Sequence, residues 1–332
     1  MIYTEFIGID VSKLTIDVWL YYAKKHMQFD NTEKGFKAML AWIRKTTKTT
    51  DTNQYLFCLE NTGLYNLPLC SFADDQQLNY CLESALRIKL SFGITRGKND
   101  KVDAERIARY CYLHREELVL SHLPAKAIRR LKKLLALRDQ LVCHNCGFKA
   151  CIKESGDFLN QKEMKEYFSV QKFLIHTYEK KIAIIDKAIK ETIDSDDDLS
   201  KISECVQSVP GIGPVITAYM LAYTNGFTAF DTWRKFACYI GIAPFANQSG
   251  TSLKGKTKVS HLANKKIKAI VNSGTRSSLQ SCKEYQQYYN RRIKEGKDEY
   301  STINIIRNKI ISRAFACAKR KTKYVNLFKF AA

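Results

Sequence analysis

Long apolar runs are missing from this sequence of 332 residues, and so is a regular cysteine framework. No apolar stretch approaches the roughly 20 residues that a membrane-spanning helix needs, so no membrane partner is expected. The 11 Cys are scattered and odd in number, which favours a reducing compartment over a disulfide-stabilised scaffold. Cys143, His144 and Cys146 have no second Cys/His pair at zinc-ribbon spacing, and these thiols are expected to be ordinary buried or helix-face groups. The N-terminus begins with a strand pattern and not a secretory signal, which predicts a cytoplasmic protein.

Acidic residues are scarce toward the C-terminus. Residues 251–332 contain 20 Lys/Arg and only 4 Asp/Glu, and the whole chain has a formal net charge of +21. Ordinary solubilising surfaces mix both signs. A surplus of one sign suits a polyphosphate, so DNA or RNA is the expected partner.

Strand and helix patterns alternate through residues 1–123. The order is an antiparallel meander of three strands (6–12, 14–22, 26–31), a helix (33–45), a strand ending at Glu60, a helix (64–76), a strand (78–84) and a helix (102–115). This is the order of a ribonuclease H-like α/β fold. We therefore predict such a domain at 1–123.

The rest of the chain is predicted to be mainly helical. Within 124–200, two long amphipathic stretches suit an antiparallel hairpin, a dimerising coiled coil or a simple spacer. Residues 201–332 begin with Gly211 and Gly213 in a turn similar to a helix-hairpin-helix. Its glycines would let backbone N–H groups approach a phosphate, and a tight interhelical turn is the alternative. A Ser/Gly/Lys-rich loop is expected at 247–260.

Four carboxylates occupy the ends of predicted elements. Asp10 ends the first strand and Glu60 the fourth, and Asp100 and Asp103 begin the last helix of the first domain. The first and fourth strands of a ribonuclease H-like sheet are neighbours, so the four acids are expected to converge, with both helix acids facing inward. Two charges ~4 Å apart repel by about 4 kcal/mol at an effective dielectric of ~20. Such a cluster needs bound cations to neutralise it. Two Mg²⁺ ions are the expected cofactor, and Mn²⁺ could replace them.

The sequence also gives expectations for two other acids and for the aromatic residues of the tail. Asp17 and Glu105 are expected to face solvent. The tail aromatics Tyr324, Phe328 and Phe330 could stack on bases or pack in the core.

Five segments resemble the DEDD transposases of the IS110 family of bacterial insertion sequences, which are related to the Piv/MooV invertases. They are FIGIDVSK, LENTGLY, KNDKVDAERIA, SVPGIGPVITA and FACYIGIAPFANQSGTS. The resemblance implies a RuvC-like domain at 1–123, a coiled-coil segment at 124–200 and a transposase domain at 201–332. It also implies a metal-binding tetrad formed by the four carboxylates, and a bacterial origin.

The nucleophile and the partners also follow from this resemblance. It implies that Ser249 attacks DNA to form a 5′-phosphoserine link, although chemistry alone leaves Thr251 and Ser252 open. It further implies a structured bridge RNA that pairs with donor and target DNA, and a homo-oligomer that forms a dimer and, in the synapse, a tetramer. Weaker nucleic-acid contacts are assigned to Gly211, Gly213, Lys254, Lys256, Lys258, Lys265 and Lys266.

One segment departs from the family pattern. His261, Leu262 and Ala263 stand where the family commonly has a Lys/Gly run. Two other functions fit the same residues: a RuvC-like nuclease that uses water as nucleophile, and a nucleic-acid-binding protein without catalysis.

Overall fold

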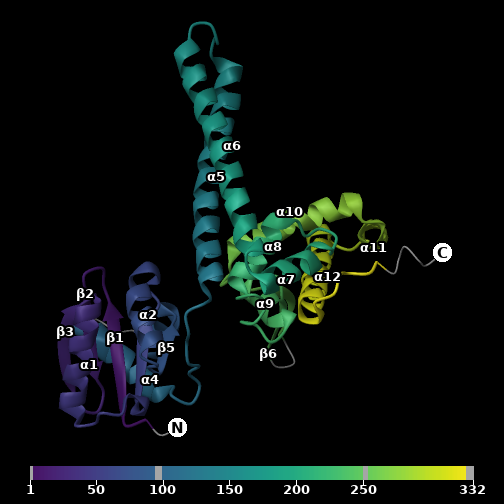
Figure 1. The fold of residues 1–332 in the computed structure, drawn as a ribbon. Helices are drawn as coiled ribbons and strands as arrows, with labels where there is room; N and C mark the ends of the chain where they lie inside the picture. Colours follow the sequence, from purple (N-terminus) through teal and green to yellow (C-terminus); the bar gives the residue numbers. More distant parts are fainter. Residues whose placement is uncertain (1–2, 94–98, 250–252, 327–332) are drawn as a thin grey trace. The chain divides into compact units, whose positions relative to one another are not determined.

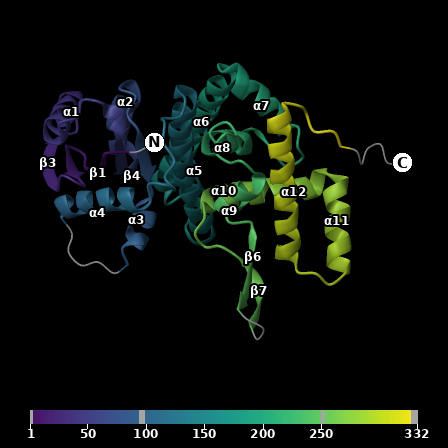
Figure 2. The same ribbon diagram turned by 90° about the horizontal axis from the view of Figure 1, so that it is seen from below.

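The computed structural model describes residues 3–93, 99–249 and 253–326 of the chain (Figures 1 and 2). The chain divides into two compact units, Met1–Leu123 and Pro124–Ala332. The first unit is mixed α/β and the second is mostly helical. In the described residues, no helix has both the length and the apolar character needed to cross a membrane.

A five-stranded mixed sheet forms the centre of the first unit. Its strands are β1 (Glu5–Val11), β2 (Thr15–Leu20), β3 (Lys25–Asp30), β4 (Tyr55–Glu60) and β5 (Tyr80–Glu83). The order across the sheet is β3-β2-β1-β4-β5. The first three strands are antiparallel, and β4 and β5 run parallel to β1. The predicted meander and the predicted contact between the first and fourth strands are both confirmed.

Helices cover both faces of this sheet. The other elements of the unit are α1 (Glu33–Thr47), α2 (Leu67–Asp75), α3 (Ala85–Ser91), α4 (Asp100–Leu113) and two short 3-10 turns, η1 (Thr52–Gln54) and η2 (Gly63–Asn66). Successive strand residues alternate between the faces. Ile7 and Ile9 therefore share a core with α1 and α2, whereas Phe6 packs on the opposite face with Ile107 of α4.

Two long helices open the second unit. α5 (Lys126–Phe158) and α6 (Lys165–Asp194) lie side by side as an antiparallel hairpin (Figure 1). This is one of the arrangements that the sequence predicts. The first turns of α5 bury Ile128, Leu131 and Leu135 in the core of the unit, so the base of the hairpin packs with the helices that follow.

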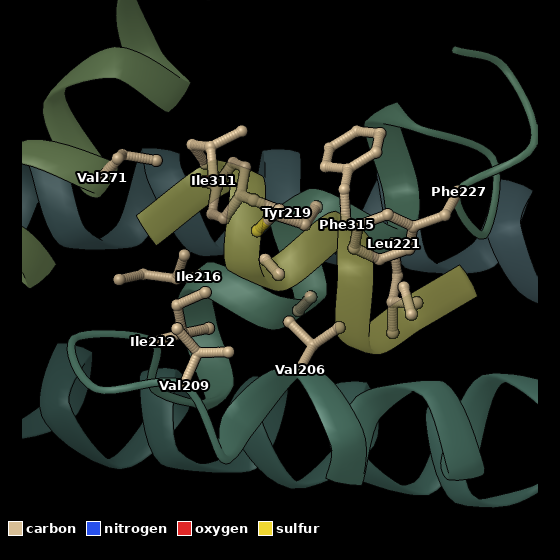
Figure 3. Close-up of a cluster of buried hydrophobic side chains, with 14 of the residues drawn as sticks. Val206, Val209, Ile212, Ile216, Tyr219, Leu221, Phe227, Val271, Ile311 and Phe315 are labelled. Carbon is tan, nitrogen blue, oxygen red and sulfur yellow. The ribbon is translucent and has the colours of Figure 1, made fainter. Parts of the chain in front are cut away.

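The remaining elements form a globular body around α8. They are α7 (Asp197–Gln207), α8 (Pro214–Tyr223), α9 (Trp233–Tyr239), β6 (Pro244–Ser249), β7 (Leu253–Val259), α10 (Lys265–Ser281), α11 (Lys283–Lys294) and α12 (Glu299–Arg320). Every residue of α8 from Ile216 to Ala222 is buried or nearly so, because apolar side chains surround the helix on all sides. Figure 3 shows Ile216 and Leu221 among side chains from α7, α10 and α12.

The prediction of a loop at 247–260 is wrong. β6 and β7 pair as an antiparallel hairpin, with Phe245 opposite Lys258 and Ser249 opposite Leu253. The strands consist mostly of polar residues, so the apolar alternation that signals a strand is absent. Backbone hydrogen bonds form this ladder without it.

Candidate active site

Asp10 and Glu60 end neighbouring parallel strands. Ile9 of β1 is paired with Leu59 of β4, and the two acids are the next residue along each strand. Both side chains are half-buried and belong to the sheet face that α4 covers. The strand pairing thus holds two carboxylates at the same edge of the sheet.

The start of α4 supplies the other two acids. Asn99 caps the helix by accepting a hydrogen bond from Lys101 N at 3.1 Å. Asp103 is half-buried and accepts a hydrogen bond from Arg106 at 3.0 Å. Asp100 is exposed, so the prediction that both helix acids face inward is wrong for this residue. Asp100 is the first helical residue, one turn before the buried stripe that begins at Ala104, and it therefore remains in solvent.

The pKa of Asp10 depends on the acidic residues near it. Burial and the nearby carboxylates raise the pKa of Asp10 from 3.8 to about 6. Burial is the largest cause, followed by the charges of Glu60, Asp103 and Asp100. All three other members of the predicted tetrad thus act on Asp10, which places them in one electrostatic neighbourhood.

The donor chemistry of this neighbourhood fits a hard divalent cation. The groups are four carboxylates without an imidazole or thiol among them, and oxygen ligands favour Mg²⁺ or Mn²⁺ over zinc. Within the described ranges, no group of three or more His, Cys, Asp or Glu side chains is placed so that it could hold a metal ion. The residues therefore fit the cofactor by donor type, and the ligand geometry is not preformed.

Ser249 lies in the second unit, at the last position of β6. Thr251 and Ser252, the alternative hydroxyls, fall outside the described residues. Lys254, Lys256 and Lys258 occupy alternate positions of β7. The backbone hairpin therefore has a serine at the end of one strand and three lysine positions in the other.

The residues predicted to contact phosphate on α10 are exposed, whereas Gly211 in the glycine turn packs against a helix. Lys265 and Lys266 are exposed in the first turn of α10, and Lys266 Nζ lies 2.8 Å from Asp139 of α5. Gly211 has a φ of +91°, and a Cβ there would lie 2.9 Å from Gly274 O in α10. Gly211 is therefore required for helix packing, as the tight-turn alternative predicts. A Cβ on Gly213 would meet no atom within 4 Å.

Comparison with known families decides the identity. A model of DEDD transposases of the IS110 type matches residues 7–153, and a model described as transposase of the IS116/IS110/IS902 family matches residues 203–290. The chain belongs to the IS110 family of transposases. The resemblance drawn from the five motifs is thereby confirmed. The first match spans the four carboxylates of this transposase and the second spans Ser249.

Relatives of the transposase extend over nearly its whole length. The pilin gene-inverting proteins of Moraxella bovis and Moraxella lacunata are each 25% identical over 326 residues, which cover 96% of this chain and 97% of theirs. An insertion element IS110 uncharacterized 43.6 kDa protein of Streptomyces coelicolor is 27% identical over 123 residues, 37% of this chain and 30% of that protein. Membership of this family makes DNA transposition or recombination the activity of the chain and suggests dependence on a divalent metal.

Two acids that flank the tetrad in the transposase were misjudged or missed from the sequence. Asp17 was expected to face solvent, but it is only 5% exposed and lies opposite Asp10 in the β1–β2 pairing. His26 Nε2 lies 2.7 Å from its carboxylate, and Gln28 donates to it at 2.9 Å. The reason for the error is that two polar residues on β3 replace the water that an Asp normally seeks.

Glu83 was not singled out by sequence reasoning, although it is 8% exposed and lies opposite Glu60. Arg87 pairs with it at 3.1 Å. A basic residue four positions after an acid at a strand–helix junction was the available signal. Glu105, in contrast, is exposed as expected.

The tail aromatics and the cysteines of α5 can be compared with their predicted roles. Tyr324 is half-buried, and its ring lies 5.0 Å from the Arg313 guanidinium, which favours packing over base stacking. Phe328 and Phe330 fall outside the described residues. Cys143 and Cys146 are exposed on α5, so they are helix-face thiols as expected.

Proposed function

We propose that this transposase cleaves and rejoins DNA with Ser249 as nucleophile and with Mg²⁺ held by Asp10, Glu60, Asp100 and Asp103. The observation that carries the proposal is the raised pKa of Asp10, which is caused by burial and by the three other acids. Carboxylates crowded in this way gain most from a bound cation. The strand order β3-β2-β1-β4-β5 with α4 against β1 supports a ribonuclease H-like, RuvC-like domain at 1–123.

The proposed chemistry is a pair of transesterifications. The Ser249 hydroxyl loses its proton and attacks a DNA phosphorus, so that a Ser Oγ–P bond forms and the P–O3′ bond breaks. The leaving O3′ takes up a proton, and the 5′ end remains as a phosphoserine ester. A 3′-hydroxyl from a second DNA end then attacks the same phosphorus and regenerates the serine. The bound Mg²⁺ would supply charge neutralisation at the phosphate and activation of the attacking oxygen.

The chain's own residues have separate parts in this proposal. Strands β1 and β4 hold Asp10 and Glu60 in register, and α4 brings Asp103 to them. Ser249 ends β6, and Lys254, Lys256 and Lys258 belong to β7, the strand paired with it. The hydroxyl and the carboxylates belong to different units of the chain. A composite site, with the two parts supplied by different subunits of a dimer or a synaptic tetramer, fits this division.

A structured bridge RNA that pairs with donor and target DNA is part of the proposal. The net charge of +21 supports a large polyanionic partner, and much of it comes from residues 251–332. We assign catalysis to 1–123, spacing and subunit contact to the helical segment 124–200, and DNA strand exchange to 201–332. The relatives named for inverting a pilin gene support recombination between DNA sites.

Capture of the covalent intermediate tests the proposal. The wild-type chain, Ser249→Ala, Ser252→Ala and Asp10→Asn are each incubated with a labelled DNA site that is nicked so that the cleaved end diffuses away. In Mg²⁺, the wild type and Ser252→Ala should form a protein–DNA adduct that resists denaturation, and the other two should not. Cleavage by Ser249→Ala but not by Asp10→Asn would establish the water-using nuclease instead. If none of the four proteins cleaves the DNA or forms the adduct, only a nucleic-acid-binding function would remain.

A further inference from the structure

Two helices of the second unit face each other with basic and amide side chains. Lys268, Asn272 and Arg276 are spaced four residues apart on α10 and therefore share a face. Arg307 of α12 donates a hydrogen bond to Asn272 Oδ1 of that face. We call Lys268, Arg276 and Arg307 the cation strip.

Arg307 lies at the centre of the strip and is not fully satisfied. It is half-buried, and one of its amino groups donates to Asn304 Oδ1 at 3.5 Å. Its Nε is buried and has no hydrogen-bond partner among the described residues. Burial, and then the charge of Arg276, lower the pKa of Arg307. Burial and Arg307 likewise lower the pKa of Lys268.

The part of the chain that the structure describes supplies no carboxylate to compensate these cations. In the described parts of the chain, no carboxylate lies within 4.0 Å of Lys268, Arg276 or Arg307. Arg313, two turns further along α12, shows the usual solution, because Glu284 accepts hydrogen bonds from it at 2.6 and 3.0 Å. Lys268 and Arg307 are half-buried, whereas Arg276 is exposed. Half-buried cations without a counter-ion cost free energy. An anion from outside the chain would remove that cost.

The strip lies at the root of the β6–β7 hairpin. Lys268 Nζ is 4.0 Å from the position that a Cβ on Gly241 would occupy. Asn304 and Asn308 donate to the carbonyl of Ile242 at 2.8 and 3.1 Å, and β6 begins two residues later. From Lys268 to Arg276 the helix rises about 12 Å, which corresponds to three or four nucleotide steps of one strand at ~3.4 Å each.

We propose that the cation strip binds the phosphodiester backbone of a nucleic-acid strand that passes the root of the serine hairpin. Arg307 would offer its unused Nε–H to a phosphate oxygen, and Lys268 and Arg276 would contact phosphates nearer the two ends of the same stretch of strand. The inference rests on the proposed function only in taking a nucleic acid as the ligand. Both DNA and RNA present this backbone, and the experiment separates them.

The test measures how binding depends on salt, in EDTA and in a Ser249→Ala background, so that catalysis plays no part. The full-length protein is titrated with labelled single-stranded DNA, duplex DNA and RNA of one sequence at several salt concentrations. The variants are Arg307→Gln and the double change Lys268→Gln with Arg276→Gln, the second of which leaves the half-buried Arg307 in place. Arg291→Gln is the control, because its side chain is 67% exposed and lies 3.7 Å from Glu295.

Each lost phosphate contact should reduce the slope of log affinity against log salt by about 0.7 on single strands and about 0.9 on duplex DNA. We expect one such step for Arg307→Gln, up to two for the double variant and none for the control. A reduction on RNA alone identifies the guide strand as the ligand, and a reduction on DNA alone identifies the substrate. Slopes equal to the parent protein on all three probes in the double variant would overturn the inference. Failure of the covalent-adduct experiment would leave this result unaffected.

Discussion

Gly8 of β1 lies directly against the backbone of Ala108 in α4: a Cβ on Gly8 would be 2.2 Å from Ala108 N and 2.3 Å from Ala104 O. No side chain fits in that space. The closeness lets α4 rest on the strand itself, and the first turn of the helix then brings Asp103 to the strand end that carries Asp10. One missing methyl group thus sets the spacing between two elements of the acidic cluster.

Replacement of Gly8 should therefore damage both stability and activity. Gly8→Ala forces the helix away from the strand, and overpacking of this kind costs about 1–3 kcal/mol or more. Denaturant unfolding measures the loss, and DNA cleavage in Mg²⁺ should fall with it. Gly147→Ala in α5 is the matched control, since a Cβ there meets no atom within 4 Å and Ala stabilises helices by roughly 0.5–1 kcal/mol. Equal stability of Gly8→Ala and the wild type would contradict the packing argument.

The pKa of Asp10 predicts an unusual dependence of stability on pH. In the folded chain this pKa is about 6, against 3.8 ordinarily, so the folded state holds the proton more tightly than the unfolded state. Stability should then fall as the pH rises from about 4 to about 6 and remain reduced above that. Asp10→Asn removes the charge. In EDTA it should melt at a higher temperature than the wild type at neutral pH and at the same temperature near pH 4.

The control for the Asp10→Asn melting experiment is an acid outside the carboxylate cluster. Glu105→Gln changes an exposed carboxylate on α4 and should leave the melting temperature unchanged across this range. A wild-type chain that melts above Asp10→Asn at neutral pH without metal would show that Asp10 is not strained by its neighbours.

Addition of divalent metal should restore the stability that repulsion between these carboxylates removes. A ligand that binds only the folded state stabilises it by RT ln(1 + [L]/Kd), about 2.7 kcal/mol at 100 times Kd. We expect Mg²⁺ or Mn²⁺ to raise the melting temperature of the wild type, and to raise that of Asp10→Asn or Glu60→Gln much less. Calorimetry with Ca²⁺-free Mg²⁺ and an EDTA reversal provides the measurement. Equal metal-induced shifts in all three proteins would place the ion elsewhere.

The ion pair between Arg313 and Glu284 should contribute strongly to the second unit. Both side chains are mostly buried, at 25% and 21% exposure, and Arg313 also donates to Tyr285 Oη at 2.8 Å. Arg313→Met leaves Glu284 without its partner, which should cost about 1–3 kcal/mol in urea unfolding. Arg291→Met breaks an exposed pair and should cost at most about 0.5 kcal/mol. Similar losses of stability in Arg313→Met and Arg291→Met would show that the buried pair contributes no more than the exposed one.

Much of the first unit could be predicted from sequence because its strands are apolar and its turns are short. The meander, the strand that ends at Glu60 and the helix after Asn99 were all visible as hydrophobic periodicity. The position of Asp10 and Glu60 at the ends of neighbouring strands followed from the predicted strand order. The exposure of Asp100 could not be predicted in that way, because spacing fixes the face of a helix but not how far its first turn extends past the sheet.

The three errors have different physical causes. Asp17 is buried because His26 and Gln28 of the next strand contact it, and no pattern local to Asp17 reveals this. The β6–β7 hairpin has no apolar alternation in its sequence, because its backbone pairs while its residues are mostly polar, so the sequence predicts a loop there. α3 was missed because seven residues are too short for helical periodicity.

The α5–α6 hairpin extends far beyond its attachment to the globular body. At 33 residues, α5 is about 50 Å long. Part-way along this helix, Asp139 accepts a hydrogen bond from Tyr219 of α8 and pairs with Lys266 of α10. About 28 Å of α5 therefore lies beyond this attachment, and Asp139 joins the hairpin directly to the helix that carries Lys268 and Arg276.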